Sequence, residues 1–188
     1  MTRWEPNARG RLEQAALELF GERGFDQTTV EDIATRAGLT KRTFFRHFSD
    51  KREVLFGGGD EFKRLFVDSL AGAPASAAPL EAVAATLETV GAAFRDRREF
   101  ARRRQLVIAA NAELQERELV KLASVAAALA DTLRERGVAE PAASITAATA
   151  IAVFRNAFER WVAAADQRDL PQHIRESLTA LQAVTAGG

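Results

Sequence analysis

One stretch of the chain, residues 28–52, constrains the fold more than any other, because it holds two short helices separated by a tight turn. Thr28 and Glu31 fit a capping box at the start of the first helix. Gly38 follows the last apolar residue of that helix, where a left-handed C-cap is expected. Thr40 can then cap a second helix with a basic start. The pattern predicts a helix-turn-helix, whose second helix enters the major groove of DNA.

The charge distribution agrees with this prediction. The whole chain is neutral, with 26 Lys and Arg residues against 26 Asp and Glu residues. Residues 36–52, in contrast, hold six Lys and Arg residues against one Asp, and His47 lies among them. Phosphate contacts supply most non-specific affinity for DNA, so a local basic patch suits a DNA-binding element. The alternative is that short capped helices with a basic surface occur in any α-helical protein.

A longer run of residues, from Arg11 to Leu55, carries a family resemblance. It includes ALELFGERGFDQTTVEDIATRAGLTKRTFFRHFSDKREVL, and it resembles the N-terminal domain of the TetR family of bacterial transcriptional regulators. Two positions depart from the family. Phe45 stands where the family usually has a Tyr whose hydroxyl reaches a phosphate, although its ring could still contact a sugar or a thymine methyl. Arg42 replaces a Gly found in many members, and could add a phosphate or guanine contact.

By this resemblance, His47 and Lys51 are expected to contact the DNA backbone. The free N–H groups of the helix that opens after Asp50, with Lys51 beside them, could hold a phosphate. Each of these residues could instead be an ordinary cap or a solvated surface residue. The full set of expected DNA-binding residues is Thr28, Thr29, Thr40, Lys41, Arg42, Thr43, Phe45, His47 and Lys51.

Composition excludes several other classes of protein. Among 188 residues, 47% are hydrophobic and none is Cys, which predicts a globular chain without disulfides or thiolate metal sites. No signal peptide and no membrane-spanning run is recognisable, so we expect a cytoplasmic protein with no membrane partner. The two His residues stand apart, and no catalytic constellation can be assembled. We therefore expect no enzyme activity, no metal and no cofactor.

Apolar periodicity predicts an all-α fold of about nine helices, since no segment alternates with period two. We expect a three-helix DNA-binding domain at residues 1–50, and a helical effector-binding and dimerisation domain at residues 51–188. Asp50 and Glu53 could form a capping box at the start of the second domain. Gly57, Gly58 and Gly59 weaken the helix that follows, either as a hinge or as a loop that breaks it.

An arginine-rich segment, RDRREFARRR, places six arginines in residues 95–104. It is either a solvated helix face or an anion pocket for a phosphorylated ligand. In the C-terminal half, RRRQLVIAANAELQERELVKLASVAAALADTLRERG followed by AVFRNAFERWVAA is similar to the C-terminal domain of the mycofactocin-system regulators of the TetR family. This resemblance implies a long-chain acyl-CoA effector. On size and position, the expected effector pocket comprises Phe94, Phe100, Arg103, Phe154, Phe158 and Trp161.

The last two predicted helices carry apolar stripes that need a partner. The TetR resemblance implies that they pair with their copies in a four-helix bundle, which makes a homodimer. The expected interface residues are Phe158, Trp161, Ile174, Leu178 and Leu181, although these could equally belong to the intramolecular core.

These predictions together indicate a ligand-responsive regulator of transcription, most simply a repressor. A dimer would bind a palindromic double-stranded DNA operator. A small, largely apolar effector would release the dimer from the operator, and an acyl-CoA is one candidate. The alternative is an α-helical binding or scaffold module of the same fold that does not bind specific DNA.

Overall fold

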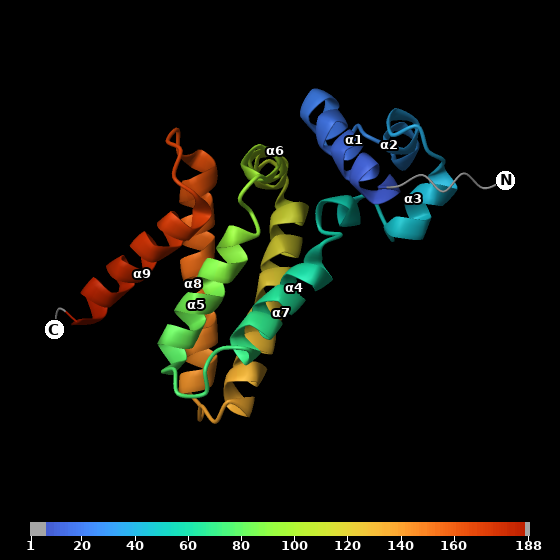
Figure 1. Cartoon of the computed structure of the whole chain (residues 1–188). Coiled ribbons are helices and arrows are strands. Elements are labelled where there is room, and N and C mark those ends of the chain that lie inside the picture. The colour runs from blue at the N-terminus through green and yellow to red at the C-terminus, as the bar shows by residue number, and fades with distance from the viewer. Residues whose placement is uncertain (1–6, 187–188) are drawn as a thin grey trace. The chain divides into compact units, whose positions relative to one another are not determined.

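The computed structural model describes residues 7–186, which contain nine α-helices, one 3₁₀ helix and no β-strand (Figure 1). The prediction of an all-α fold with about nine helices is confirmed. The helices are α1 (Ala8–Arg23), α2 (Val30–Arg36), α3 (Lys41–His47), the 3₁₀ helix η1 (Arg52–Leu55), α4 (Gly59–Ala71), α5 (Pro79–Ala92), α6 (Arg98–Ala109), α7 (Ala112–Glu135), α8 (Ala142–Ala163) and α9 (Leu170–Ala186). Within the described part of the chain, none of these helices is both long and apolar enough to cross a bilayer.

Packing divides the chain into two compact units. The N-terminal unit comprises the residues up to Gly59 together with Arg103–Glu118, and the C-terminal unit comprises Asp60–Arg102 and the residues from Leu119 onward. Helices α6 and α7 therefore each contribute residues to both units. The division of function at residue 50 stays a prediction.

Apolar residues of α1 form the centre of the N-terminal unit. Leu12, Ala16 and Leu19 are almost completely buried. The helix ends at Gly24, whose φ of 84° is a left-handed value that favours glycine. Phe25 then folds back, and its ring centroid lies 5.1 Å from that of Phe20. The two rings therefore pack against each other where the chain leaves α1.

The segment between α3 and α4 is not a continuous helix. Residues 52–55 form one 3₁₀ turn, and α4 begins only at Gly59, so the glycines accompany a break between the two elements. Gly57 also allows close packing, because a Cβ atom there would lie 2.5 Å from a ring carbon of Phe48 and 3.2 Å from the carbonyl oxygen of Glu53. Glycine at this position is thus required by space.

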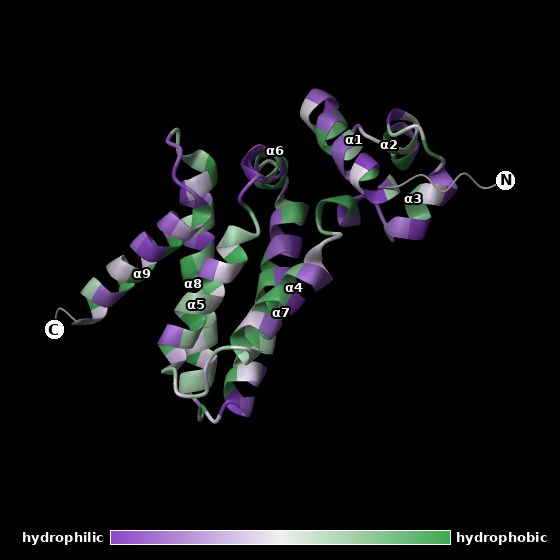
Figure 2. Cartoon of the chain, viewed as in Figure 1, coloured by the Kyte–Doolittle hydropathy of each residue, from purple (hydrophilic) through white to green (hydrophobic). Residues whose placement is uncertain are grey.

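The core of the C-terminal unit is formed mainly by buried residues of α4, α5, α7, α8 and α9, and α8 contributes the most. Figure 2 shows α5 and α8 carrying mostly hydrophobic residues, whereas α9 alternates between hydrophobic and hydrophilic ones. Helix α5 approaches α9 closely at Gly91, where a Cβ atom would lie 2.7 Å from Cδ1 of Ile174. Pro79 lies in the first turn of α5, where a missing N–H removes no intrahelical bond.

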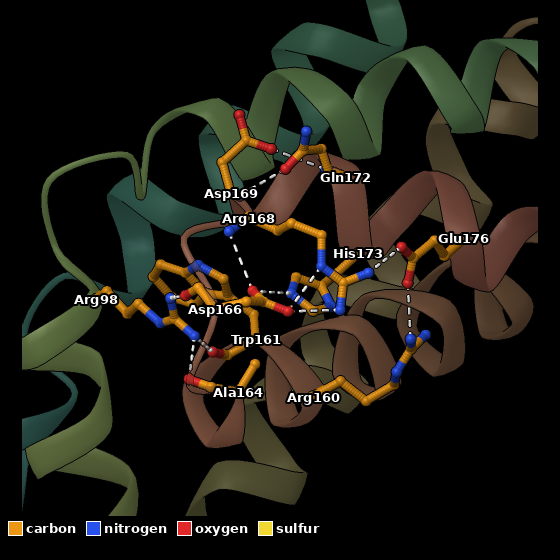
Figure 3. Close-up of polar contacts among 10 residues, drawn as sticks. All are labelled: Arg98, Arg160, Trp161, Ala164, Asp166, Arg168, Asp169, Gln172, His173 and Glu176. Carbon is orange, nitrogen blue, oxygen red and sulfur yellow. Dashed lines mark hydrogen bonds and ion pairs between the residues drawn. The ribbon is translucent and has the colours of Figure 1, made fainter.

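The loop between α8 and α9 is held by one arginine of α6 (Figure 3). The guanidinium group of Arg98 donates to the backbone carbonyls of Trp161, at 2.7 Å, and of Ala164 and Asp166. These carbonyls include the end of α8, which has no intrahelical donor left for them. A cation at a helix C-terminus also interacts favourably with the helix dipole. One member of the arginine-rich segment is therefore neither solvated nor bound to an anion.

His173 of α9 lies behind this loop and is only 1% exposed. Both of its ring nitrogens are buried without a hydrogen-bond partner, and Nε2 lies 4.0 Å from Oδ1 of Asp166 (Figure 3). Burial lowers the pKa of His173, and the positive charge of Arg168 lowers it further. The nearby carboxylates of Glu176 and Asp166 act in the opposite direction, but they already pair with Arg168.

We expect the protein to lose stability as the pH falls below about 6.5, because the unfolded chain then takes up a proton that folded His173 resists. Replacement by leucine, His173→Leu, should remove part of this loss. The measurement is the free energy of unfolding in urea at pH 7.5 and pH 5.5. His47→Leu controls for the other histidine. An unchanged pH dependence in His173→Leu would contradict this reading.

Candidate nucleic-acid interface

Helix α2 begins one residue later than the sequence pattern predicted. Thr29 is its N-cap, and its hydroxyl accepts from the N–H of Asp32 at 3.1 Å. The carboxylate of Asp32 accepts from the Thr29 N–H at 2.9 Å and completes the capping box. The prediction that Thr28 and Glu31 form this box is wrong. The local sequence allows a cap at either Thr28 or Thr29. Because the side chain of Thr28 is buried, Thr29 is the cap.

Thr28 lies inside the N-terminal unit and is 1% exposed. Its hydroxyl donates to the carbonyl oxygen of Gly24 at 2.8 Å, with the carbonyl of Leu19 at 3.4 Å. The side chain therefore joins the end of α1 to the start of α2 and presents no surface to a phosphate. Thr28 is removed from the set of DNA-binding residues, whereas Thr29 is exposed.

Helix α3 is positioned by two buried phenylalanines. Phe44 is completely buried, and Phe48 nearly so, with ring centroids 5.4 Å apart. At the start of the helix, Thr40 accepts from the N–H of Thr43 at 3.1 Å, as the sequence predicted for an N-cap. Gly38 has a φ of 66° and makes the turn between α2 and α3. The predicted helix, turn and helix are thus present in this order.

The opposite face of α3 is exposed and basic. With about 100° per residue, Arg42 and Arg46 point away from Phe44, and Phe45 lies beside them. Phe45 is 50% exposed. Within residues 7–186, the side chains of Lys41, Arg42 and Arg46 make no hydrogen bond or ion pair. Their charges are therefore available to a partner.

Other basic residues near α3 already have intramolecular partners. Arg36 pairs with Glu22 at 2.8 Å and with Glu18 at 3.4 Å. Arg11 donates to the carbonyl oxygen of Ala37. Because these arginines are paired, the unpaired positive charge lies on α3 and is not spread over the whole N-terminal unit.

His47 and Lys51 are half-buried rather than extended into solvent. Nε2 of His47 is buried without a partner, and burial lowers the pKa of its ring, as do Arg46 and Arg9. Nζ of Lys51 donates to the carbonyl oxygen of Phe25 at 2.6 Å and lies 4.1 Å from the centre of that ring. Burial lowers the pKa of Lys51. A phosphate contact by Lys51 would have to replace its present bond.

The turn after α3 is capped by Asp50. Its Oδ1 accepts from the N–H groups of Arg52, at 2.8 Å, and Glu53, at 3.1 Å. The prediction that these N–H groups are free for a phosphate is wrong, because the carboxylate already uses them. The side chain of Glu53 does not complete a capping box, since it pairs with Arg117 instead.

The N-terminal unit contains a contact that the sequence did not indicate, between η1 and residues 103–118. Arg104 donates to the carbonyl oxygen of Leu55 at 2.7 Å and to Glu118 at 2.9 Å, and lies 4.9 Å from the ring centre of Phe56. Arg117 pairs with Glu53, and Arg52 with Glu113. These partners are far apart along the chain, so no local pattern could have identified them. Arg104 belongs to the arginine-rich segment, and it serves here as a structural cation.

The expected effector-pocket residues fall into two groups. Four of them share one aromatic cluster of the C-terminal unit, in which neighbouring ring centroids lie about 5 to 6 Å apart. Phe62 and Phe66 of α4 extend this cluster. Phe100 is half-buried outside it, and Arg103 is exposed within the part of α6 that belongs to the N-terminal unit. The four residues that the structure brings together are Phe94, Phe154, Phe158 and Trp161.

The expected dimer-interface residues are mostly core. Trp161, Ile174 and Leu178 are buried within the protomer, so they have little surface to offer a second copy. Phe158 and Leu181 are partly buried against the same core. Assigning Trp161, Ile174 and Leu178 to the interface is therefore corrected: the apolar stripes find their partner mainly inside the C-terminal unit.

Comparison with known proteins identifies the family. Residues 13–56 match the bacterial regulatory proteins of the tetR family, and residues 77–186 match the MftR C-terminal domain. The chain belongs to the TetR family. This assignment agrees with the order of helices and with the free basic face of α3.

Relatives of this TetR-family protein are regulators of transcription. TcmR, an HTH-type transcriptional regulator of Streptomyces glaucescens, is 39% identical over 88 residues, which are 47% of this chain and 39% of TcmR. The HTH-type transcriptional repressor KstR2 of Mycobacterium tuberculosis is 42% identical over 62 residues, which are 33% of this chain and 29% of KstR2. The matches thus span less than half the length of these relatives.

A solved structure shows the same fold. The transcriptional regulator FadR from Bacillus subtilis, in complex with stearoyl-CoA, has a TM-score of 0.64 and 20% sequence identity; the match covers 92% of this chain and 96% of FadR. At this identity the likeness concerns the fold alone.

We expect Thr28→Val to lower the free energy of unfolding by about 1 kcal/mol, because it removes a buried hydroxyl that bonds a backbone carbonyl. Urea unfolding measures the change. Thr28→Ser keeps the hydroxyl and should retain more of the stability. Full stability in Thr28→Val would show that the hydroxyl bond contributes nothing.

Proposed function

We propose that this TetR-family chain is a ligand-responsive transcriptional repressor that binds a palindromic operator as a dimer. The observation that carries the proposal is the exposed face of α3, where three cations lack any intramolecular partner within residues 7–186. Such a face, on the second helix of a helix-turn-helix, suits the negatively charged major groove.

The residues around α3 supply the remaining contacts of the proposed interface. Thr29 and Thr40 cap α2 and α3, and their exposed positions suit hydrogen bonds to phosphates on either side of the groove. Thr43 lies beside Thr40, with hydroxyl oxygens 3.0 Å apart. His47 and Lys51 would contribute after a change of side-chain conformation. Together with Lys41, Arg42 and Phe45, this set comprises the sequence-predicted residues without Thr28. Arg46, which the sequence analysis did not include, is added because it is exposed on the same helix.

A homodimer formed through α8 and α9 matches the symmetry of a palindromic operator. Trp161, Ile174 and Leu178 are buried, so the interface would use the outer faces of these helices. Ile145 of α8 and Val184 of α9 remain 61% and 83% exposed. Both lie toward the helix ends away from the loop that joins α8 to α9.

The proposed effector is a largely apolar molecule of the acyl-CoA class. Two observations support this class: the aromatic cluster of the C-terminal unit, and the shared fold with FadR bound to stearoyl-CoA. Helices α6 and α7 contribute to both units, so a shift of either helix on effector binding would reach the contact between Arg104 and Leu55. The regulator would act in the bacterial cytoplasm, where the operator lies.

We expect tight binding to a selected duplex, with the logarithm of affinity falling steeply as the logarithm of salt concentration rises. Fluorescence anisotropy across a salt series measures this, and sedimentation gives the number of protomers per duplex. Lys41→Ala and Arg46→Ala should each weaken binding, because they remove an unpaired cation.

Arg64→Ala is the matched control, since Arg64 is an exposed arginine of α4, outside the helices of the proposed dimer interface, and its ion pair is with Glu61 at 3.7 Å. It should leave affinity unchanged. Weak binding of every duplex alike would sink the repressor proposal and favour a scaffold module without specific DNA binding.

For the effector, we expect stearoyl-CoA to release the duplex at concentrations where free coenzyme A does not, because the acyl chain would bury apolar surface among the rings. Phe158→Ala should raise the concentration needed for release. The same anisotropy assay provides the measurement. If neither stearoyl-CoA nor lauroyl-CoA changes the anisotropy or the melting temperature, the acyl-CoA class is excluded.

A further inference from the structure

The exposed face of α3 carries two side chains of contrasting chemistry at neighbouring positions. Arg42 and Phe45 are separated by three residues, which places them on adjacent parts of the face and about 4.5 Å apart along the helix axis. Their Cα positions are fixed from behind, because Phe44 lies between them in sequence and is completely buried. The pair is therefore presented outward by a rigid support.

Arg42 is free to bind without first losing an intramolecular bond. Within the described residues its guanidinium group has no carboxylate or carbonyl partner, unlike Arg36 and Arg52, which are held by ion pairs. Arg42 is also the second residue of the helix, and a recognition helix contacts base edges with its N-terminal residues. Arg46 lies a full turn further on.

The chemistry of a guanidinium group selects one base in the major groove. Guanine offers two acceptors there, O6 and N7, which match the two parallel donors of an arginine, whereas adenine offers one acceptor and one donor. Arg42 thus favours a guanine edge over the other three bases.

Phe45 presents an apolar surface and no hydrogen-bond donor. Its ring is half exposed, and it is fixed by an edge-on contact with Phe44, with centroids 5.5 Å apart and an interplanar angle of 83°. In the major groove, the thymine methyl group is the apolar feature that such a ring can contact. An exposed aromatic ring on an otherwise basic face gains most at that base.

We propose that Arg42 and Phe45 determine the operator sequence: each half-site carries a guanine bound by Arg42 and, one or two base pairs away, a thymine whose methyl group contacts Phe45. The spacing follows from the separation of about 4.5 Å along α3, compared with about 3.4 Å per base pair. This inference rests on the proposed function of sequence-specific DNA binding, and it names the bases read.

The test begins with selection of duplexes from a random library by the full chain, followed by anisotropy on the enriched duplex. Arg42→Ala should weaken binding about 5- to 100-fold and remove the preference for guanine at one position per half-site. In the unaltered protein, 7-deazaguanine at that position should weaken binding, because it lacks the N7 acceptor. Inosine is the matched control, since it keeps both major-groove acceptors. The Arg42→Ala variant should not distinguish 7-deazaguanine from guanine.

Phe45 is tested in the same duplex by replacing thymine with deoxyuridine, which removes only the methyl group. The unaltered protein should bind the deoxyuridine duplex several-fold more weakly, and Phe45→Ala should bind both duplexes equally. Phe45→Tyr keeps the ring and should still prefer thymine. Circular dichroism and urea unfolding establish that each variant is folded.

Two failures are distinguishable. If no sequence is enriched, the proposed function itself fails. If a sequence is enriched, but Arg42→Ala weakens all duplexes equally and reduces the salt slope by about 0.9 per lost phosphate contact, Arg42 binds phosphate and the inference alone is overturned. An enriched site without the guanine and thymine pair overturns it as well.

Discussion

The burial of Phe44 orients helix α3 and thereby the proposed DNA-binding surface. Helix α3 has only seven residues, and a helix of this length is not stable alone in water. Its one fully buried side chain fixes the rotation of the helix about its own axis. Arg42 and Arg46 then point outward because they lie on the opposite side. The packing of Phe44 thus determines which side chains of α3 are exposed.

The exposed face of α3 is positively charged because cations elsewhere in the protein are paired, and not because the chain has an excess of positive charge. The chain has no net charge, and most of its cations are bound to carboxylates or carbonyls. Among the residues that the structure describes, the cationic side chains without a hydrogen bond or ion pair are those of Lys41, Arg42, Arg46, Arg95 and Arg97. Three of them lie on α3. The unpaired positive charge of the N-terminal unit therefore lies on α3, whereas Arg95 and Arg97 precede α6 in the C-terminal unit.

The arginine-rich segment shows how the same residue type serves different purposes. Arg98 holds the carbonyls of the loop between α8 and α9, and Arg104 holds the carbonyl of Leu55. Both satisfy backbone acceptors at the end of a helix, which would otherwise lack partners. The solvated-face interpretation and the anion-pocket interpretation each miss these two residues. Hydrogen bonds to backbone carbonyls hold these two side chains in place.

Local patterns in the sequence predicted the order of the helices, the turn at Gly38 and the cap at Thr40. These features depend on residues within about four positions of one another, which is the range of a helical turn and its caps. The match to the TetR family covers residues 13–56, and the motif that identifies it likewise consists of residues close together in the sequence.

Other features depend on contacts between residues far apart in the sequence, and local patterns do not predict them. Thr28 moved from a predicted phosphate contact into the core, because its hydroxyl meets carbonyls at the end of α1. Trp161 and Ile174 belong to the core rather than to an interface, because Ile174 of α9 packs closely at Gly91 of α5, and the ring of Trp161 in α8 lies 6.2 Å from that of Phe94. Arg117 forms an ion pair with Glu53, which lies 64 residues away in the sequence. Periodicity shows which face of a helix is apolar, but only packing decides which neighbour covers that face.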